Sequence, residues 1–264
     1  MEDYIESYLK LHKQYLDLRG NEFDDQDIDQ SAISYAYNTC GIEGNTITLG
    51  ETETIIISDK VIEGKSLQEH NQIKNAYDAF RRMFDFAKEG FEMNEALAMT
   101  FHKMNTTGWL KEEWSGKYKT INNRVGGRST PYPEKAKGLY KDLFKELPSI
   151  SDPVKRAVKL HLATVIIHPW QDGNGRTARL LMNFELVKNG HGHIQISKNN
   201  KDVYFKAIRS AIDDKSIKPF ERYIYELGNR TYEKKIDFLD QKKKSKNQKM
   251  TLWDFNEKVE LYAK

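Results

Sequence analysis

The sequence is poor in cysteine and in long apolar runs, and each shortage narrows what the protein can be. Cys40 is the only cysteine among 264 residues, so an intramolecular disulfide is impossible and a cysteine-based zinc site is not expected. Apolar stretches such as Val165-Ile166-Ile167 are far shorter than the ~18 residues that a membrane-spanning helix needs. The first residues, Met1 to Glu6, are acidic and show no apolar signal segment. We therefore expect a cytoplasmic protein.

Neither charge sign dominates the sequence. There are 42 Lys and Arg residues against 39 Asp and Glu residues, so the formal net charge is +3. This excess is too small to indicate a nucleic-acid or membrane partner, and any anion binding must be local. The one basic run, residues 241–249, is typical of a solvated helix end or tail, and a nucleic-acid contact is its less favoured interpretation.

Proline is also scarce, with six residues, and apolar residues recur three and four apart over long stretches. This pattern predicts a mainly α-helical protein. The expected helices cover residues 4–18, about 29–41, 66–88, 93–104, 134–147, 153–167, 176–188, 203–212 and 218–239. Between residues 116 and 133 the turn formers Asn122-Asn123 and Gly126-Gly127 stand among apolar residues, which predicts one irregular β-hairpin.

The stretch most informative about chemistry reads His-Pro-Trp-Gln-Asp-Gly-Asn-Gly-Arg-Thr-Ala-Arg from His168 onward. Gly173 and Gly175 permit a tight turn whose backbone N–H groups point into one concavity, and the positive end of the following helix adds to it. Arg176 and Arg179 stand on one helix face at the rim, where guanidinium groups bind phosphate oxygens. The pattern predicts a cradle for a polyphosphate.

The same stretch supplies a base and a metal ligand. His168, with a reference pKa of about 6.5, is mostly neutral at neutral pH and can take a proton from a hydroxyl nucleophile. Asp172 offers a hard oxygen ligand for a magnesium ion that water and substrate otherwise hold. Asn183 shares the helix face of the two arginines. Together these groups provide what nucleotidyl or phosphoryl transfer needs.

Other glycine-rich loops do not fit this stretch. An EF-hand loop that begins at Asp172 would need glycine and glutamate where the chain has Thr177 and Asn183. A Walker A loop would need Gly-Lys-Ser/Thr after the glycines, and that sequence is missing. A merely structural turn would not need a histidine, an aspartate and two arginines.

Residues 168–179 resemble the signature of Fic proteins, His-Pro-Phe-x-Asp/Glu-Gly-Asn-Gly-Arg-x-x-Arg, with Trp170 in the position usually held by Phe. That position anchors the loop in the core, so a larger apolar ring is compatible with the resemblance. Weaker similarities lie at residues 67–69, 75–76, 116–118, 204 and 219–220. The resemblance implies an all-α Fic/Fido helical fold with a β-hairpin flap.

The family resemblance implies transfer of AMP from ATP to a Ser, Thr or Tyr hydroxyl of a target protein, including autoadenylylation. ATP would be the co-substrate and Mg²⁺ the cofactor. His168 would be the general base and Asp172 the magnesium ligand. The flap at residues 117–133 would hold a target segment in extended form by strand-like pairing.

The resemblance also assigns the nucleotide contacts. The hole for the α- and β-phosphates would be formed by Gly173, Asn174 and Gly175. Arg176 would hold the β-phosphate and Arg179 the γ-phosphate. Tyr204 lies where the family lines its adenine pocket.

A second motif, Thr-Cys-Gly-Ile-Glu-Gly from Thr39 to Gly44, resembles the family's inhibitory pattern Ser/Thr-x-x-x-Glu-Gly/Asn. Thr39 would hold Asn174, and Glu43 would pair with Arg179. A carboxylate there takes the place of the γ-phosphate, so ATP would bind unproductively until the pair breaks. A plain helix end, with Gly44 as its C′ residue, is the alternative.

The remaining histidines do not predict a metal site. His191 and His193 lack a third ligand nearby and are typical of a turn. His102 and His161 lie on apolar helix faces, where hydrogen-bonded core histidines are usual.

These expectations divide the chain into an N-terminal helical segment at 1–90 with the inhibitory motif, a catalytic core at 91–228 and a basic helical tail at 229–264. Two rival functions stay open. An enzyme that removes AMP would use the same loop if Glu43 oriented a water, and a non-catalytic nucleotide-sensing or DNA-linked regulator would use the basic run. A homo-oligomer is compatible with the sequence, whereas nucleic-acid and membrane partners are not expected.

Overall fold

The computed structural model describes the backbone of residues 2–20 and 25–262, and their side chains except at positions 26, 242 and 245–262. The chain forms two compact units. The larger unit spans residues 24–224, and the smaller combines residues 1–23 with 225–264. The domain boundaries after residues 90 and 228 stay predictions.

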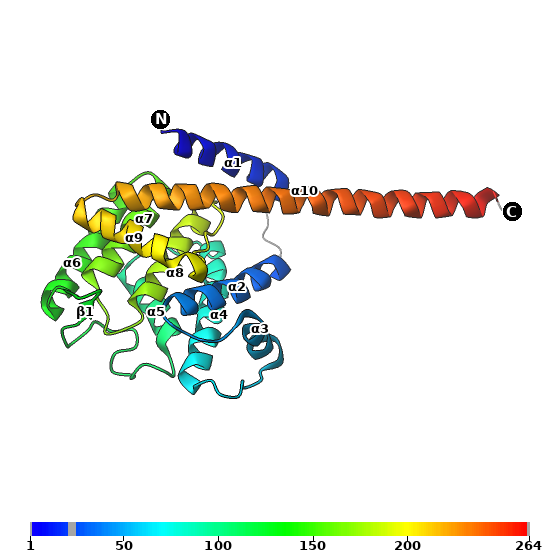
Figure 1. Ribbon diagram of the computed structural model, residues 1–264. Helices are drawn as coiled ribbons and strands as arrows, with labels where there is room; N and C mark the ends of the chain where they lie inside the picture. The colour runs from blue at the N-terminus through cyan, green and yellow to red at the C-terminus, as the bar shows by residue number, and fades with distance from the viewer. Residues whose placement is uncertain (1, 21–24, 263–264) are drawn as a thin grey trace. The chain divides into compact units, whose positions relative to one another are not determined.

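The larger unit is almost entirely helical, which confirms the expected fold class. Its elements are α2 (Asp25–Ile42), α3 (Leu49–Ser58), α4 (Leu67–Lys88), α5 (Glu95–Thr106), β1 (Arg124–Val125), β2 (Arg128–Ser129), α6 (Pro133–Glu146), the 3-10 turn η1 (Leu147–Ser149), α7 (Pro153–Ile167), α8 (Asn174–Lys188), the 3-10 turn η2 (Lys198–Asn200), α9 (Lys201–Asp213) and the start of α10 (Lys218–Tyr262) (Figure 1). In the described ranges β1 and β2 are the only strands, and they pair antiparallel within the predicted hairpin.

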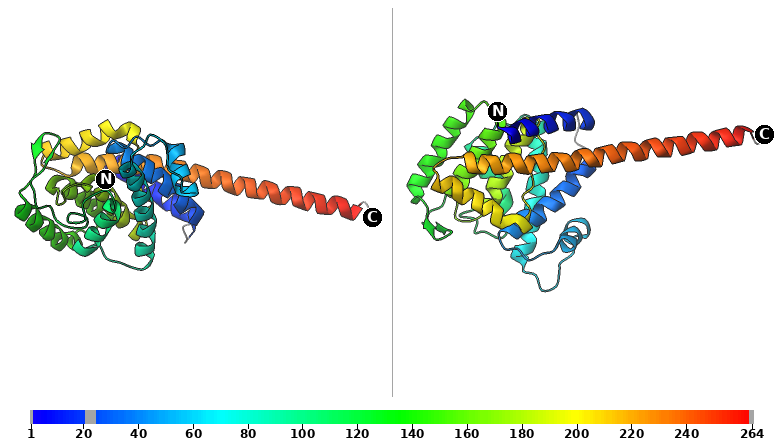
Figure 2. Two further views of the ribbon diagram at one scale, coloured as in Figure 1. Left: turned by 90° about the horizontal axis from the view of Figure 1, so that it is seen from below. Right: turned by 45° about the horizontal axis from the view of Figure 1, so that its top comes forward.

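Helix α8 is the centre of the larger unit. The helix packs against α7, α4, α5 and α2 (Figure 2). Every side chain from Arg176 to Val187 is buried as a result. Helix α7 begins with Pro153 at its first turn, and the Asp152 carboxylate accepts hydrogen bonds from the N–H groups of Val154 and Lys155. The loop that carries the signature thus joins two tightly packed helices, which fixes both of its ends.

Sequence reasoning misses α3, which a capping box starts. The Thr48 hydroxyl accepts a hydrogen bond from the N–H of Glu51 at 3.3 Å, and the Glu51 carboxylate accepts one from the N–H of Thr48 at 2.7 Å. The Thr-x-x-Glu spacing before an apolar run is the signal that identifies such a helix start.

In the smaller unit, α1 (Asp3–Arg19) pairs with α10 through tyrosine rings. The ring of Tyr8 lies 5.1 Å from that of Tyr225 and 5.2 Å from that of Tyr232. The basic run at 241–249 continues this helix, and most of its side chains lie outside the described residues. Among the described helices, none combines the length and apolar character needed to cross a membrane.

Glu69 fastens the segment after α2 to the start of α4. One carboxylate oxygen accepts hydrogen bonds from the N–H and hydroxyl of Thr46 at 3.0 and 2.7 Å. The other accepts from the N–H and hydroxyl of Ser66 at 3.0 and 2.9 Å. These hydrogen bonds, those from Thr46 foremost, lower the pKa of Glu69 to about 2. Because Thr46 follows Glu43 closely, the contact fixes the chain just beyond the Thr39–Gly44 motif.

The substitution Glu69→Ala removes these hydrogen bonds and the capping box of α4, so we expect the free energy of unfolding at pH 7 to fall by about 1–2 kcal/mol. The folded pKa lies below the ordinary value of 4.5, so this stabilisation is complete above that pH and fades as the pH falls toward 2. Urea unfolding of wild type and variant at pH 7 and at about pH 3 measures both effects. Gln68→Ala, at an exposed neighbouring position, is the control. A deficit in the Glu69 variant that is the same at both pH values would show that the ionised carboxylate is not what stabilises this segment.

Candidate active site

The loop between α7 and α8 has its conformation set at three points. His168 ends α7 with a left-handed φ of 53°, and its N–H donates to the carbonyl of Thr164. Gly173 precedes α8 with a φ of 77°, and an added Cβ would lie 2.8 Å from the Thr106 side chain. Trp170 is fully buried, which confirms that it anchors the loop in the core. The loop therefore has little freedom to rearrange.

Asn174 stabilises the loop from within. Its side-chain oxygen accepts from the N–H of Trp170 at 3.0 Å, and its amide donates to the Trp170 carbonyl at 2.9 Å. The predicted contact of Thr39 with Asn174 is wrong, because the Asn174 side chain is already satisfied by its own loop. The Thr39 hydroxyl instead accepts a hydrogen bond from Nε of Arg179 at 2.8 Å.

Arg179 and Glu43 meet over the glycine cradle, as predicted. Nη2 of Arg179 donates to Oε1 of Glu43 at 2.8 Å and to the carbonyl of Thr39 at 3.0 Å. A Cβ added to Gly175 would collide with the Glu43 carboxylate, so this acid lies directly over the second glycine. Burial would raise the pKa of Glu43, but the charge of Arg179 and its hydrogen bond hold it below the ordinary value. At neutral pH the cradle therefore contains an anion of the chain itself.

Arg176 is buried but has few partners. Its residue is 3% exposed, and Nη2 lies 3.9 Å from Oδ1 of Asp172. Among the described residues, none accepts a hydrogen bond from Nε or Nη1 of Arg176. Buried guanidinium groups without acceptors are costly, so these donors suit an anionic ligand.

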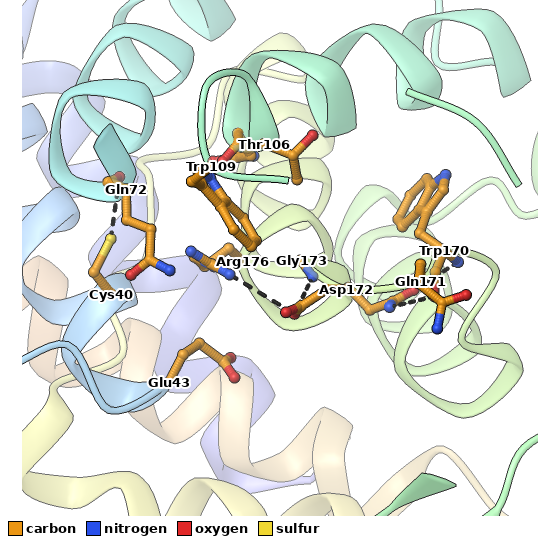
Figure 3. Close-up of polar contacts among 12 residues, drawn as sticks. Cys40, Glu43, Gln72, Thr106, Trp109, Trp170, Gln171, Asp172, Gly173 and Arg176 are labelled. Atoms are coloured by element: carbon orange, nitrogen blue, oxygen red, sulfur yellow. Dashed lines mark hydrogen bonds and ion pairs between the residues drawn. The ribbon is translucent and has the colours of Figure 1, made fainter. Parts of the chain in front are cut away.

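Asp172 projects from the loop beside Arg176. Its side chain is 62% exposed, and Oδ1 accepts from the N–H of Gly173 at 2.5 Å (Figure 3). In the parts of the chain that the structure describes, no cluster of three His, Cys, Asp or Glu side chains could hold a metal ion. Any cation here would thus depend on one carboxylate and a ligand.

His168 is a neutral imidazole in this setting. Burial and then the charge of Lys119 lower its pKa to about 4, against smaller opposing effects of the Val165 carbonyl and of the Asp172 and Glu43 carboxylates. A histidine with this pKa is unprotonated at pH 7 and available as a proton acceptor.

His102 joins the loop to the flap, a role that sequence reasoning misses. Its Nδ1 accepts from the N–H of Gly116 at 2.9 Å, so Nε2 carries the proton that is donated to the Asp172 carbonyl at 2.9 Å. Its ring also stacks on Trp170, with centroids 4.4 Å apart. An apolar helix face predicts a buried histidine, but nothing in the sequence tells which distant backbone groups it contacts.

Lys119 ties the two arms of the flap together. Its ammonium donates to Oδ1 of Asn123 at 2.8 Å and to the hydroxyl of Thr130 at 2.7 Å, and its backbone N–H donates to the Pro169 carbonyl at 2.9 Å. Asn123 in turn donates to the Trp170 carbonyl at 3.0 Å. Burial lowers the pKa of Lys119 to about 8. The base of the flap is therefore fixed to the signature loop.

Of two other predicted site residues, Tyr204 contacts Arg179, whereas Asn183 does not reach the cradle rim. The Tyr204 hydroxyl accepts from Nη1 of Arg179 at 3.4 Å and shares a 2.9 Å hydrogen bond with His161. Its adenine contact stays a prediction. Asn183 does not reach the cradle rim, because its side chain pairs with the N–H and carbonyl of Ile194 at 2.7 and 3.0 Å.

Comparison with known proteins agrees with this geometry. Residues 91–186 match the Fic/DOC family. The chain is 33% identical over 198 residues to protein adenylyltransferase fic-1 of Caenorhabditis elegans, covering 72% of this chain and 38% of that protein. It is 31% identical over 206 residues to protein adenylyltransferase Fic of Drosophila ananassae, covering 76% and 41%. The chain thus spans about two fifths of the length of these curated relatives.

Solved structures show the same fold. A Fic-1 structure from C. elegans superimposes with a TM-score of 0.79 at 25% identity, covering 90% of this chain and 73% of that one. A Fic domain containing signaling protein from Bacteroides thetaiotaomicron also gives 0.79, at 23% identity over 89% of this chain and 97% of that one. The helical arrangement around the signature loop is therefore that of known Fic structures.

Replacing Lys119 with glutamine should raise the pKa of His168 by about one unit, because a buried positive charge is removed from its surroundings. Lys119→Arg keeps the charge and should leave the pKa low. NMR titration of the imidazole signals measures both, with His168→Ala to assign the resonance. An unchanged pKa in the glutamine variant would show that Lys119 does not act on this histidine.

Proposed function

Since residues 91–186 place this chain in the Fic/DOC family, we propose that the protein is a protein adenylyltransferase that moves AMP from ATP to a Ser, Thr or Tyr hydroxyl. The observation that carries the proposal is the neutral His168 beside a glycine cradle with two buried arginines at its rim. The names of the relatives, which are protein adenylyltransferases, support the same reaction.

The chemistry follows from the positions of these groups. The target hydroxyl oxygen bonds to the α-phosphorus of ATP, its proton passes to His168, and the bond from the α-phosphorus to the bridging oxygen breaks. Pyrophosphate leaves with both electrons of that bond. The N–H groups at the start of α8 and Arg176 hold the inner phosphates, and Arg179 holds the γ-phosphate. Charge neutralisation and proton removal at one place are what such a transfer requires.

Asp172 is the residue that would hold magnesium. An exposed carboxylate beside an anion cradle fits this ion, because magnesium binds proteins through one or two carboxylates and completes its shell with phosphates and water. When bound, the ion would neutralise phosphate charge.

The flap at 117–133 is the proposed docking site for the target. Ile121 and Tyr132 are exposed by 55% and 72%, so the flap presents an apolar and an aromatic side chain that a bound segment can contact. A target segment that pairs with the flap backbone would place its hydroxyl by main-chain contacts, with little demand on its sequence.

Glu43 inhibits the resting enzyme in this proposal. Its carboxylate lies over Gly175 and pairs with Arg179, the group proposed for the γ-phosphate. Two anions cannot share this place, so ATP binds productively only after Glu43 moves. Thr39 strengthens the restraint because it takes two further N–H groups of Arg179.

A second candidate activity is the removal of AMP from a modified protein. The Glu43 side chain is 35% exposed and acts electrostatically on His168, so it is placed to orient a water molecule. The two activities respond oppositely to Glu43→Gly: AMP removal is lost, whereas AMP transfer rises.

His168→Ala should lower AMP transfer by about 10²- to 10⁴-fold, because the attacking hydroxyl must then lose its proton without a positioned base. Nucleotide binding should be nearly unchanged. Transfer of label from ATP and calorimetric binding of ADP measure the two effects in the same Glu43→Gly background. Transfer at the parent rate would remove His168 from the mechanism.

Glu43→Gly should raise AMP transfer well above a low wild-type level, since it frees Arg179 for the γ-phosphate. The gain requires this arginine, so Arg179→Ala should abolish it in the double variant, and the two effects should not add. Glu63→Gly, at an exposed turn position, is the matched control and should leave transfer unchanged.

A thermal melt accompanies each of these assays. If Glu43 were only a helix-end residue, its loss would lower stability without any gain in transfer. That result in the Glu43→Gly protein would refute the inhibitory role.

A further inference from the structure

Arg176 has one face covered by an aromatic ring. Its guanidinium carbon lies 4.3 Å from the centre of the Trp109 ring, close enough for a cation–π contact (Figure 3). The contact matters because Asp172, at 3.9 Å, is too far for a strong hydrogen bond, and because Nε and Nη1 find no acceptor among the described residues. The Trp109 ring thus covers one face of this buried cation, whose other neighbours include the Asp172 carboxylate and the Cys40 thiol.

Trp109 itself is rigidly placed. Its indole N–H donates to the carbonyl of Asn105 at 2.7 Å, so the side chain is hydrogen-bonded to the last turn of α5. The carbonyls of the two preceding residues accept from the side chains of Asn75 and Asn71, at 2.7 and 2.9 Å. Three hydrogen bonds, two of them from α4, therefore fix the loop that presents the ring.

We propose that Trp109 is a positioning residue for Arg176, holding the guanidinium by its face so that its unpaired N–H groups stay available to the inner phosphates of a nucleotide. This role of Trp109 rests on the proposed role of Arg176 in binding ATP. A face contact is suited to the task because it leaves the donor edge of the guanidinium unused, whereas a carboxylate would compete with the phosphates for the same N–H groups.

The first test needs no nucleotide. A ring over a guanidinium shifts the NMR signal of the Arg176 Nε–H group upfield, and Arg176→Lys assigns that signal. Trp109→Leu should abolish the shift, and Trp109→Phe should keep part of it. Trp114→Leu is the matched control, because Trp114 lies on the same loop over Lys111, 5.0 Å from its ammonium. A signal that Trp109→Leu leaves in place would overturn the proposal.

The second test measures the consequence for ligand binding. Calorimetry with ADP and magnesium, in the Glu43→Gly background, should show binding weakened by about tenfold in Trp109→Leu, less in Trp109→Phe and not at all in Trp114→Leu. The KM for ATP should rise while kcat stays near the parent value. Equal affinities for all variants would contradict the positioning role.

The two tests separate this inference from the proposed function. If the Glu43→Gly parent binds no ADP, the proposed function fails, and the Arg176 signal alone decides whether Trp109 holds the guanidinium. Thermal melts show whether the Trp109→Leu protein is as stable as its parent. If it is not, the Trp109→Phe variant decides both tests.

Discussion

A guanidinium as deeply buried as that of Arg179, in a residue 2% exposed, is stable only where acceptors and a counter-charge surround it. In this protein the end of α2 and the residue that follows it supply them, through the hydroxyl and carbonyl of Thr39 and the carboxylate of Glu43. The buried guanidinium on the central helix α8 therefore has its partners within the chain, at the place proposed for the γ-phosphate. In the proposed mechanism the carboxylate and the γ-phosphate are alternative partners of this one cation, which would connect the fold to its regulation.

The position of Glu43 is fixed by contacts that do not involve the cradle. Gln195 donates to the Ser34 hydroxyl at 2.7 Å, and the N–H of Lys198 donates to Asn38 at 3.0 Å. Asn45, just beyond the motif, donates to the carbonyl of Glu69 at 3.1 Å. The second half of α2 and the residues just after it are thus held in place, so the Glu43 carboxylate stays over the cradle as long as this packing persists.

The sequence predicts the parts of the site that are local in the chain. Periodicity and capping residues locate most helices. Twelve consecutive residues identify the loop with His168 and Asp172, because the histidine, the aspartate and the two arginines around the glycines do not fit other glycine-rich loops. The spacing of Thr39 and Glu43 predicts their shared face, and the structure brings both to Arg179.

The sequence does not predict contacts between distant segments. His102 meets the carbonyl of Asp172 across 70 positions, and Thr39 bonds to Arg179 instead of Asn174, because Asn174 closes its own loop. Such pairings depend on how the helices pack, and a local sequence pattern does not predict that packing. Trp109 belongs to the same class, since only the fold places its ring over a guanidinium 67 residues later.

The competition between Glu43 and the outermost phosphate is tested most directly by calorimetry with two nucleotides. Titrating ATP and AMP into the wild-type and Glu43→Gly proteins compares a ligand that reaches Arg179 with one that lacks the outer phosphates. If the two anions compete for Arg179, removing Glu43 tightens the binding of ATP and leaves that of AMP nearly unchanged. Equal changes for both nucleotides, or no change for ATP, would contradict this competition.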